Sequence, residues 1–254
     1  MKLFRFIHNQ EPCLGCLDGD KLRVLEKKGD GYGEETGETT DMSKTKILVP
    51  VLPSKVVALG LNYRDHAREM GQEPPKEPII FLKAPSSVIG PDDPIIYPSG
   101  GITVRVDYEA ELGIVIGKRC KVVKAEDAED YIMGYTCVND VTARDLQIKD
   151  GQWARAKSFD TFCPIGPCIE TELDPSELSV QAVLNDKTVQ DSSTKELIFA
   201  VPEIIEFVSR VMTLFPGDVI ATGTPPGVGP LQDGDTITVY VEGIGRLTNQ
   251  VQSE

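Results

Sequence analysis

Three acidic residues occupy alternate positions in the segment VDYEAELG, residues 106–113. Successive side chains of a β-strand point to opposite faces, so Asp107, Glu109 and Glu111 would share one face and the intervening apolar residues the other. A strand with one solvated, acidic face is one interpretation of this alternation. Like charges on one face repel, and a solvated face usually includes Lys or Thr. A cation bound on the acidic face is therefore the other interpretation.

A further carboxylate, Asp140, follows the apolar run at residues 135–138. A strand that ends on Asp is also typical of a turn. Together with Glu109 and Glu111, Asp140 would offer three carboxylates to one cation, and all-oxygen ligation favours Mg²⁺, Mn²⁺ or Ca²⁺ over zinc. The chain has only two histidines, which makes a His-based zinc site hard to assemble.

One of these histidines, His66, precedes Glu69 by three residues in the segment YRDHAREMG, residues 63–71. We expect a helix here that ends at Gly71, with Asn62 and Asp65 forming a box at its start. Residues three apart on a helix lie on one face, and a histidine held by a carboxylate is the usual construction of a general base. A surface His–Glu pair is the alternative.

Two lysines and a glycine-rich loop are further candidates. Lys83 in FLKAPSS and Lys157 in ARAKSFD follow apolar or small residues, so each either faces an anion or extends to solvent. The loop TGTPPGVG, residues 222–229, has backbone amides that could hold a carboxylate, but it lacks the Gly-Lys-Ser/Thr of a phosphate loop. Turn formation alone also explains its composition.

Composition excludes several classes of partner. A net charge of −14 over 254 residues disfavours nucleic acid and anionic membranes, so a small-molecule ligand is expected. No run of 18 apolar residues occurs, and the opening MKLFRFIHNQ resembles a first strand rather than a signal peptide, which predicts a cytoplasmic protein. Cys13 and Cys16 form a C-x-x-C, but no second pair completes a zinc set, so free buried thiols are expected.

The pattern of elements is mostly β with few helices. Residues 1–27 read as short strands, and residues 27–44, rich in Gly, Glu and Thr, as a loop or linker. Apolar, β-branched runs predict strands at residues 56–62, 131–140, 167–172, 180–186 and 236–243, whereas residues 201–215 form the one long amphipathic helix. We therefore predict a mixed, β-rich α+β fold, with a small N-terminal β domain and linker at 1–50 and a catalytic domain at 51–254.

The order of six blocks resembles the fumarylacetoacetate hydrolase family from about Val56 to the C-terminus. The blocks are GLNYRDHAREM, FLKAPSS, DYEAELGIVIGK, NDVTARDLQ, AKSFDTFCPIGP and GDVIATGTPPGVG. The resemblance implies a mixed β-sandwich roll that forms homodimers and carries a divalent ion, Mg²⁺ or Mn²⁺, at the mouth of the roll. The first 50 residues carry no specific motif and are similar to the small variable domain of shorter members.

The same resemblance implies roles for individual residues. The metal ligands are Glu109, Glu111 and Asp140. The catalytic groups are His66, Glu69 and Lys157, with the first two on a segment that closes over the substrate. The substrate pocket includes Lys83, Arg144, Gln147 and Thr224.

The chemistry implied is stabilisation of an enolate beside a 2-oxo acid. If the His66–Glu69 pair holds a water, an acylpyruvate is split into pyruvate and a carboxylic acid, and the presence of this pair favours that reaction. Decarboxylation of oxaloacetate, keto–enol tautomerisation and isomerisation of a 5-carboxymethyl-2-hydroxymuconate-type acid are the alternatives. A metal-binding structural module without turnover is a remote further alternative, which the complete set of site residues disfavours.

Overall fold

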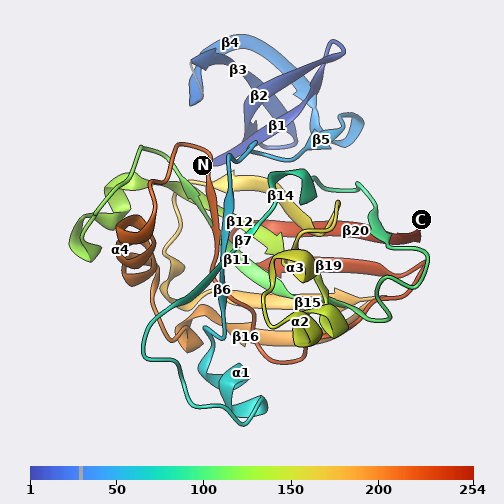
Figure 1. The fold of residues 1–254 in the computed structure, drawn as a ribbon. Helices are drawn as coiled ribbons and strands as arrows, with labels where there is room; N and C mark the ends of the chain where they lie inside the picture. Colours follow the sequence, from blue (N-terminus) through green and yellow to red (C-terminus); the bar gives the residue numbers. More distant parts are fainter. Residues whose placement is uncertain (29–30) are drawn as a thin grey trace.

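The computed structural model describes residues 1–28 and 31–254. The N-terminal part is an antiparallel meander of four strands, β1 (Lys2–His8), β2 (Glu11–Asp18), β3 (Lys21–Lys28) and β4 (Gly31–Asp41), with the short β5 (Ile47–Leu48) beside β1. Figure 1 shows this meander (blue) standing above the rest of the molecule. β1 also pairs with β14 of the main body, through Leu3 opposite Ile169, so one sheet runs through both parts.

The prediction of a loop or linker at residues 27–44 is wrong for most of that segment. Residues 31–41 form β4, at the edge of the large sheet, and Met42–Lys44 form a 3₁₀ turn; residues 29 and 30 lie outside the described part. An edge strand needs backbone pairing on one side only, and β4 obtains it from β3, with Leu22 opposite Thr40. Its polar composition, which resembled a loop, is also how natural edge strands avoid pairing with other chains.

The main body is built from two facing sheets with short connecting strands. Its strands are β6 (Val56–Gly60), β7 (Ile79–Lys83), β8 (Val88–Ile89), β9 (Ile95–Tyr97), β10 (Val106–Tyr108), β11 (Ala110–Ile116), β12 (Ile132–Asn139), β13 (Thr142–Ala143), β14 (Cys163–Glu170), β15 (Ser179–Leu184), β16 (Lys187–Ser193), β17 (Val219–Ala221), β18 (Gly229–Pro230), β19 (Thr236–Val241) and β20 (Gly245–Ser253). The large sheet has the order β4-β3-β2-β1-β14-β12-β11-β17-β6-β7, and the second sheet β16-β15-β19-β20-β9. A small third sheet has the order β13-β10-β18.

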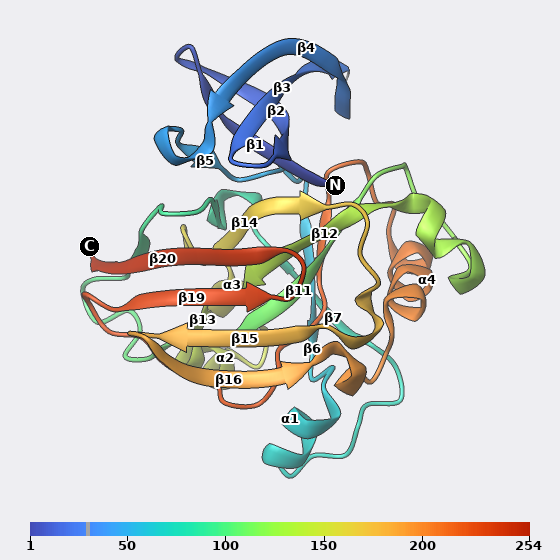
Figure 2. The same cartoon turned by 180° about the vertical axis from the view of Figure 1, so that it is seen from behind.

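The core lies between these sheets. Figure 2 shows β15, β16, β19 and β20 in front of β11 and β12. Leu112 and Ile114 of β11 belong to the same buried cluster as Val180 of β15, Val239 of β19 and Leu247 of β20. The alternation of apolar residues on these strands therefore supplies the shared interior of a β-sandwich, and the predicted β-rich fold is confirmed.

Helices are few and short. They are α1 (Arg64–Glu69), α2 (Arg144–Asp150), α3 (Ala154–Lys157) and α4 (Val201–Val211), with 3₁₀ turns at Pro85–Ser87, Ala125–Tyr131, Pro175–Glu177 and Thr194–Glu196. α4 ends four residues earlier than expected. Leu214, which was expected in the helix, instead forms a backbone bridge with Cys120. Among the described residues, no helix combines the length and apolarity needed to cross a membrane.

The helix box expected at Asn62 is also wrong. The residue that caps α1 is Tyr63, and it makes no side-chain cap bond. The buried side-chain amide of Asn62 donates to the Phe199 and Thr222 carbonyls, and its oxygen accepts from Phe199 N at 2.9 Å. Asn62 therefore joins three loops next to the site rather than starting a helix.

The six cysteines are free thiols, as expected, and five of them are buried.

Candidate active site

The acidic segment is two strands that meet at Glu109. β10 pairs with β13 and β18, whereas β11 pairs with β12 and β17. Asp107, Glu109 and Glu111 are 0%, 6% and 1% exposed, so the solvated-face interpretation is wrong. Asp140 N donates to Glu109 O at 2.9 Å, which brings the end of β12 beside this junction.

Carboxylate oxygens of Glu109, Glu111 and Asp140 lie within 4.8 Å of one another. Lys157, at the end of α3, donates to Glu109 Oε2 at 2.8 Å and to Asp140 Oδ2 at 2.6 Å. Lys83, at the end of β7, donates to the other oxygen of Asp140 and to the Val141 carbonyl. Both lysines are buried, so they face anions and do not extend to solvent.

The surrounding charges shift the pKa values of Glu109 and Glu111 in opposite directions. Burial alone would raise the pKa of Glu109, but Lys157 and Arg144 outweigh it and hold that pKa well below its usual range. Burial, and then the neighbouring Asp140 and Glu109, raise the pKa of Glu111 well above its usual range. For Lys157, burial opposes the charge, but Asp140 and Glu109 prevail and raise its pKa. Glu111 is thus the carboxylate whose charge is least compensated.

The donor set fits a hard divalent cation. Glu111 Oε2 accepts from Gly223 N at 2.7 Å, whereas the buried Glu111 Oε1 has no hydrogen-bond partner among the described residues. An unpaired, buried carboxylate oxygen costs free energy unless a positive charge lies near it. Three convergent carboxylates without nitrogen or sulfur ligands suit Mg²⁺, Mn²⁺ or Ca²⁺.

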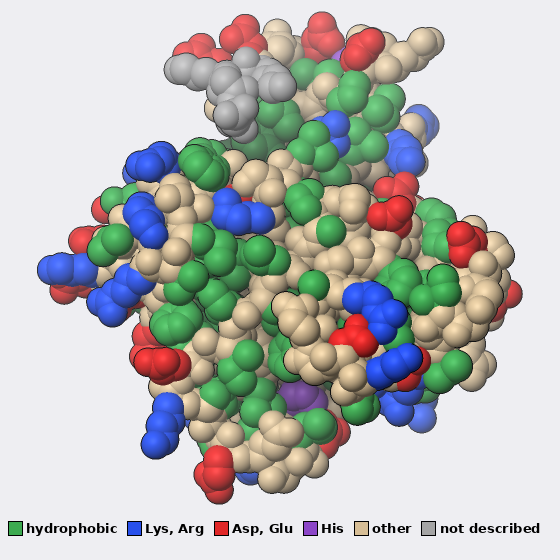
Figure 3. Space-filling view, viewed as in Figure 1, with side chains coloured by type: hydrophobic (Ala, Val, Ile, Leu, Met, Phe, Trp, Pro, Cys, Tyr) green, Lys and Arg blue, Asp and Glu red, His purple; other side chains and the backbone are tan. Residues whose placement is uncertain are grey.

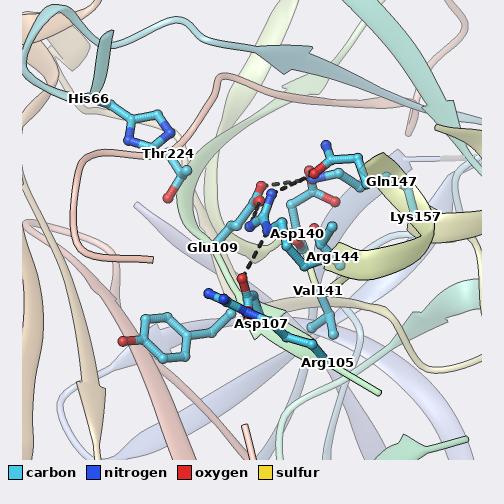
Figure 4. A network of polar contacts seen from close by, with 12 residues as sticks. His66, Arg105, Asp107, Glu109, Asp140, Val141, Arg144, Gln147, Lys157 and Thr224 are labelled. Atoms are coloured by element: carbon cyan, nitrogen blue, oxygen red, sulfur yellow. Dashed lines mark hydrogen bonds and ion pairs between the residues drawn. The ribbon is translucent and has the colours of Figure 1, made fainter. Parts of the chain in front are cut away.

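Arg144, the first residue of α2, is held by a second group of contacts. Its Nε donates to Asp107 Oδ2 at 2.8 Å, its Nη1 to Gln147 Oε1 at 2.6 Å, and its Nη2 to Glu109 Oε1. Figure 4 shows the guanidinium between Asp107 and Glu109. Asp107 was not among the individual site residues predicted from the sequence, although its place on the acidic face was the signal that could have found it; the cation that it faces there is the Arg144 guanidinium.

His66 and Glu69 form the predicted pair on α1. His66 Nδ1 lies 2.9 Å from Glu69 Oε2, and Gly227 N donates to Glu69 Oε1 at 3.1 Å. The loop at residues 222–229 therefore does bind carboxylates through its amides, but they are the protein's own Glu69 and Glu111. In the same loop, Thr224 Oγ1 donates to the Ala110 carbonyl at 2.9 Å.

A cavity of about 260 Å³ brings most of these residues together. The polar and charged side chains that line it are His66, Gln72, Glu109, Arg144, Gln147, Lys157 and Thr224. Figure 4 shows His66 and Thr224 on one side and Glu109, Arg144 and Lys157 on the other. Of the three clustered carboxylates, only Glu109 lines the cavity. Lys83 does not line it and binds Asp140 instead. The apolar lining, which includes Phe81 and Trp153, was not foreseen from the sequence.

Comparison with known proteins shows the family of the chain. Residues 55–252 match the family described as fumarylacetoacetate (FAA) hydrolase C-terminal, and residues 1–50 match Rv2993c-like, N-terminal. The chain is 43% identical, over 221 residues, to oxaloacetate tautomerase Fahd2a, mitochondrial, of Rattus norvegicus, covering 82% of this chain and 70% of that protein.

Two solved structures share the whole fold. One is 5-carboxymethyl-2-hydroxymuconate delta-isomerase from Mycobacterium smegmatis, with a TM-score of 0.93, 44% identity and complete coverage of both chains. The other is maleylpyruvate hydrolase from Sphingobium sp. SYK-6 in complex with manganese(II) and pyruvate, with a TM-score of 0.82, 30% identity and coverage of 100% of this chain and 99% of that one. The chain belongs to the fumarylacetoacetate hydrolase family.

Proposed function

We propose that this protein is a divalent-metal-dependent enzyme that acts on 2-oxo acids and hydrolyses the C–C bond of an acylpyruvate. The observation that carries the proposal is the cavity itself, which has Glu109 of the carboxylate cluster, with Arg144 and Lys157, on one side and the carboxylate-held His66 on the other. A substrate with two carbonyl groups in line could contact both sides at once.

Glu109, Glu111 and Asp140 would hold the ion, Mg²⁺ or Mn²⁺, with Ca²⁺ as a further candidate. When bound, the ion supplies positive charge that favours the enolate form of a 2-oxo acid. A family member binds manganese(II) together with pyruvate, which supports this assignment. Lys157 and Arg144 reach the same side of the cavity and would bind the substrate carboxylate.

His66 would act as the general base. With a proton on Nδ1 donated to Glu69, Nε2 is left as an acceptor that can take a proton from water. The water oxygen then bonds to the distal carbonyl carbon, and the bond from that carbon to the methylene group breaks. Its electron pair remains on the methylene carbon, which takes up a proton. The products are pyruvate and a carboxylic acid.

Tautomerisation or isomerisation of a 2-oxo acid is the second candidate. The named activities of the Rattus norvegicus relative and the Mycobacterium smegmatis structure favour it. The same residues would then move a proton between carbon and oxygen, and no bond to water would form.

A substrate panel tests the two candidates. Acetylpyruvate, fumarylpyruvate, oxaloacetate and a hydroxymuconate derivative are incubated with the protein in Mg²⁺ or Mn²⁺, and pyruvate, CO₂ and enol absorbance are measured. We expect pyruvate release from an acylpyruvate that stops when the metal is chelated. Enol loss without pyruvate would favour tautomerisation, CO₂ release would favour decarboxylation, and undiminished activity in chelator would contradict the metal site.

A homodimer is proposed as the functional form. β7 is the edge strand of the large sheet, and its Ile79 and Leu82 side chains are 42% and 47% exposed. An exposed apolar edge is a typical pairing surface. Light scattering on the purified protein should give about twice the 27.8 kDa chain mass, and the mass of one chain would contradict the dimer.

A further inference from the structure

One part of the cavity is apolar. Besides its charged groups, the lining includes Leu59 of β6, Phe81 of β7, Met70 after α1, Ile148 of α2 and Trp153 before α3. Figure 3 shows hydrophobic side chains around a histidine on this face of the molecule. Five separate segments therefore contribute apolar side chains to the lining of one cavity.

Two of these side chains are unusually accessible. Met70 is 54% and Ile148 78% exposed, although both line the cavity. A single exposed apolar residue is normal on a protein surface. Two that border one cavity from different helical segments form an apolar rim, and a ligand that filled the cavity would cover them.

The Trp153 ring is fixed in place. It packs edge-on against Phe81 with ring centroids 5.1 Å apart. It also fills the space above Gly60, where a Cβ atom would lie 2.6 Å from the indole ring. The aromatic part of the wall is thus preorganised, which lowers the cost of ordering it around a ligand.

The charged groups of the lining offer little to a second carboxylate. Lys157 pairs with Glu109 and Asp140, and Arg144 with Glu109 and Asp107. In the proposed function both already bind the carboxylate of the 2-oxo acid itself, so neither remains for a second carboxylate. Glu69, which holds His66, adds a negative charge on the histidine side. A distal carboxylate would lose hydration against the apolar wall without gaining a free cation among the described lining residues.

We propose that the group distal to the 2-oxo acid in the preferred substrate is uncharged and apolar, a short alkyl or aryl chain, and that Met70, Ile148 and Trp153 hold it. This inference rests on the proposed function and narrows it to acylpyruvates with an apolar acyl group. It sets the chain apart from a relative named for maleylpyruvate, whose substrate carries a second carboxylate.

Binding to the single tryptophan tests the proposal without turnover. Because Trp153 is the only tryptophan and lines the cavity, its fluorescence reports ligands directly. In Mg²⁺, the probes are matched pairs: 2-oxopentanoate against 2-oxoglutarate, and 2-oxohexanoate against 2-oxoadipate. We expect each monoacid to bind about tenfold more tightly than its diacid, and each added methylene of the monoacid to tighten binding about threefold to fourfold. Diacids that bind as tightly as monoacids would overturn the proposal.

A charge introduced at the rim sharpens the test. Ile148→Lys should favour the diacids, shifting the monoacid-to-diacid ratio about tenfold. Val122→Lys, at a position 65% exposed and outside the cavity lining, is the matched control and should leave the ratio unchanged. If Ile148→Lys behaves as Val122→Lys does, Ile148 does not contact the distal group and the proposal fails.

Turnover measured in parallel separates this proposal from the function on which it rests. Faster turnover of fumarylpyruvate than of acetylpyruvate and its longer alkyl homologues would overturn the apolar specificity and leave acylpyruvate hydrolysis standing. Failure to bind or convert any 2-oxo acid in Mg²⁺ or Mn²⁺ would overturn both. Faster turnover as the alkyl group lengthens, with little turnover of the diacids, is the expected result.

Discussion

Replacing Glu111 by Gln should weaken Mn²⁺ binding about 100-fold and leave the fold intact. Glu111 is a sharper choice than Glu109, which also binds Lys157 and Arg144 and whose loss would take from each of these cations one of its two carboxylate partners. Glu111 accepts one bond, from Gly223 N, and a glutamine oxygen can accept the same bond. The substitution removes the negative charge that Glu111 would offer to a cation, a charge that burial, Asp140 and Glu109 disfavour when no cation is bound.

The expected stability change follows from the loss of affinity. A 100-fold larger dissociation constant corresponds to a loss of about 2.7 kcal/mol of binding free energy. With Mn²⁺ at 100 times the wild-type dissociation constant, the ion would stabilise the wild type by about 2.7 kcal/mol and the variant by about 0.4 kcal/mol. For a chain of this size, the difference of about 2.3 kcal/mol corresponds to roughly 5–9 °C in Tm.

Calorimetric titration with Mn²⁺ and thermal unfolding with Mn²⁺ or chelator would measure both quantities. In chelator, Glu111→Gln should be about as stable as the wild type, because burial and the neighbouring carboxylates raise the pKa of Glu111 and favour its neutral form, which glutamine matches in charge and shape. Glu34→Gln, at an exposed position on β4, is the control and should bind Mn²⁺ as the wild type does. Wild-type Mn²⁺ affinity in Glu111→Gln would refute the assignment of this carboxylate as a ligand.

Three further changes probe other parts of the structure. His66→Ala should lower kcat for acylpyruvate hydrolysis about 10²–10⁴-fold with unchanged Mn²⁺ affinity, and it should slow oxaloacetate decarboxylation less. Steady-state kinetics with both substrates measures the two losses. Equal losses would contradict a role of His66 in activating water. Lys157→Met leaves Glu109 and Asp140 without their shared cation and should lower the free energy of unfolding by about 3–5 kcal/mol, as measured in urea; an unchanged midpoint would contradict the importance of that ion pair. Asp218 is a buried carboxylate away from the cavity, and it binds a lysine and three backbone amides. Asp218→Asn should therefore lower the free energy of unfolding by about 3 kcal/mol and leave kcat unchanged. A selective loss of activity would place Asp218 in the catalytic machinery instead.

The acidic cluster was predictable because strand alternation and the end of a neighbouring strand are local signals. The spacing of Glu109 and Glu111 put them on one face, and the turn after β12 brought Asp140 beside them. The sequence did not indicate that the strand divides at Glu109, because the two halves pair with different partners. A strand's partners can lie far away in the sequence, so the local residue pattern does not reveal them.

Residues that act through distant contacts were missed or misassigned. Asn62 resembled a helix cap because its neighbours are helical, yet its amide joins loops more than 130 residues away in the sequence. Met70, Ile148 and Trp153 carry no motif, and only the folded chain brings them to one cavity. The polar β4 was read as a linker because edge strands and loops share a composition.

In the proposed function, three carboxylates hold one divalent ion beside the cavity. Anomalous X-ray diffraction from crystals grown with Mn²⁺ measures this most directly. We expect a single strong peak within about 2.5 Å of oxygens from Glu109, Glu111 and Asp140. A peak elsewhere, or none at saturating Mn²⁺, with the three side chains still held by Lys83, Lys157 and Arg144, would contradict it.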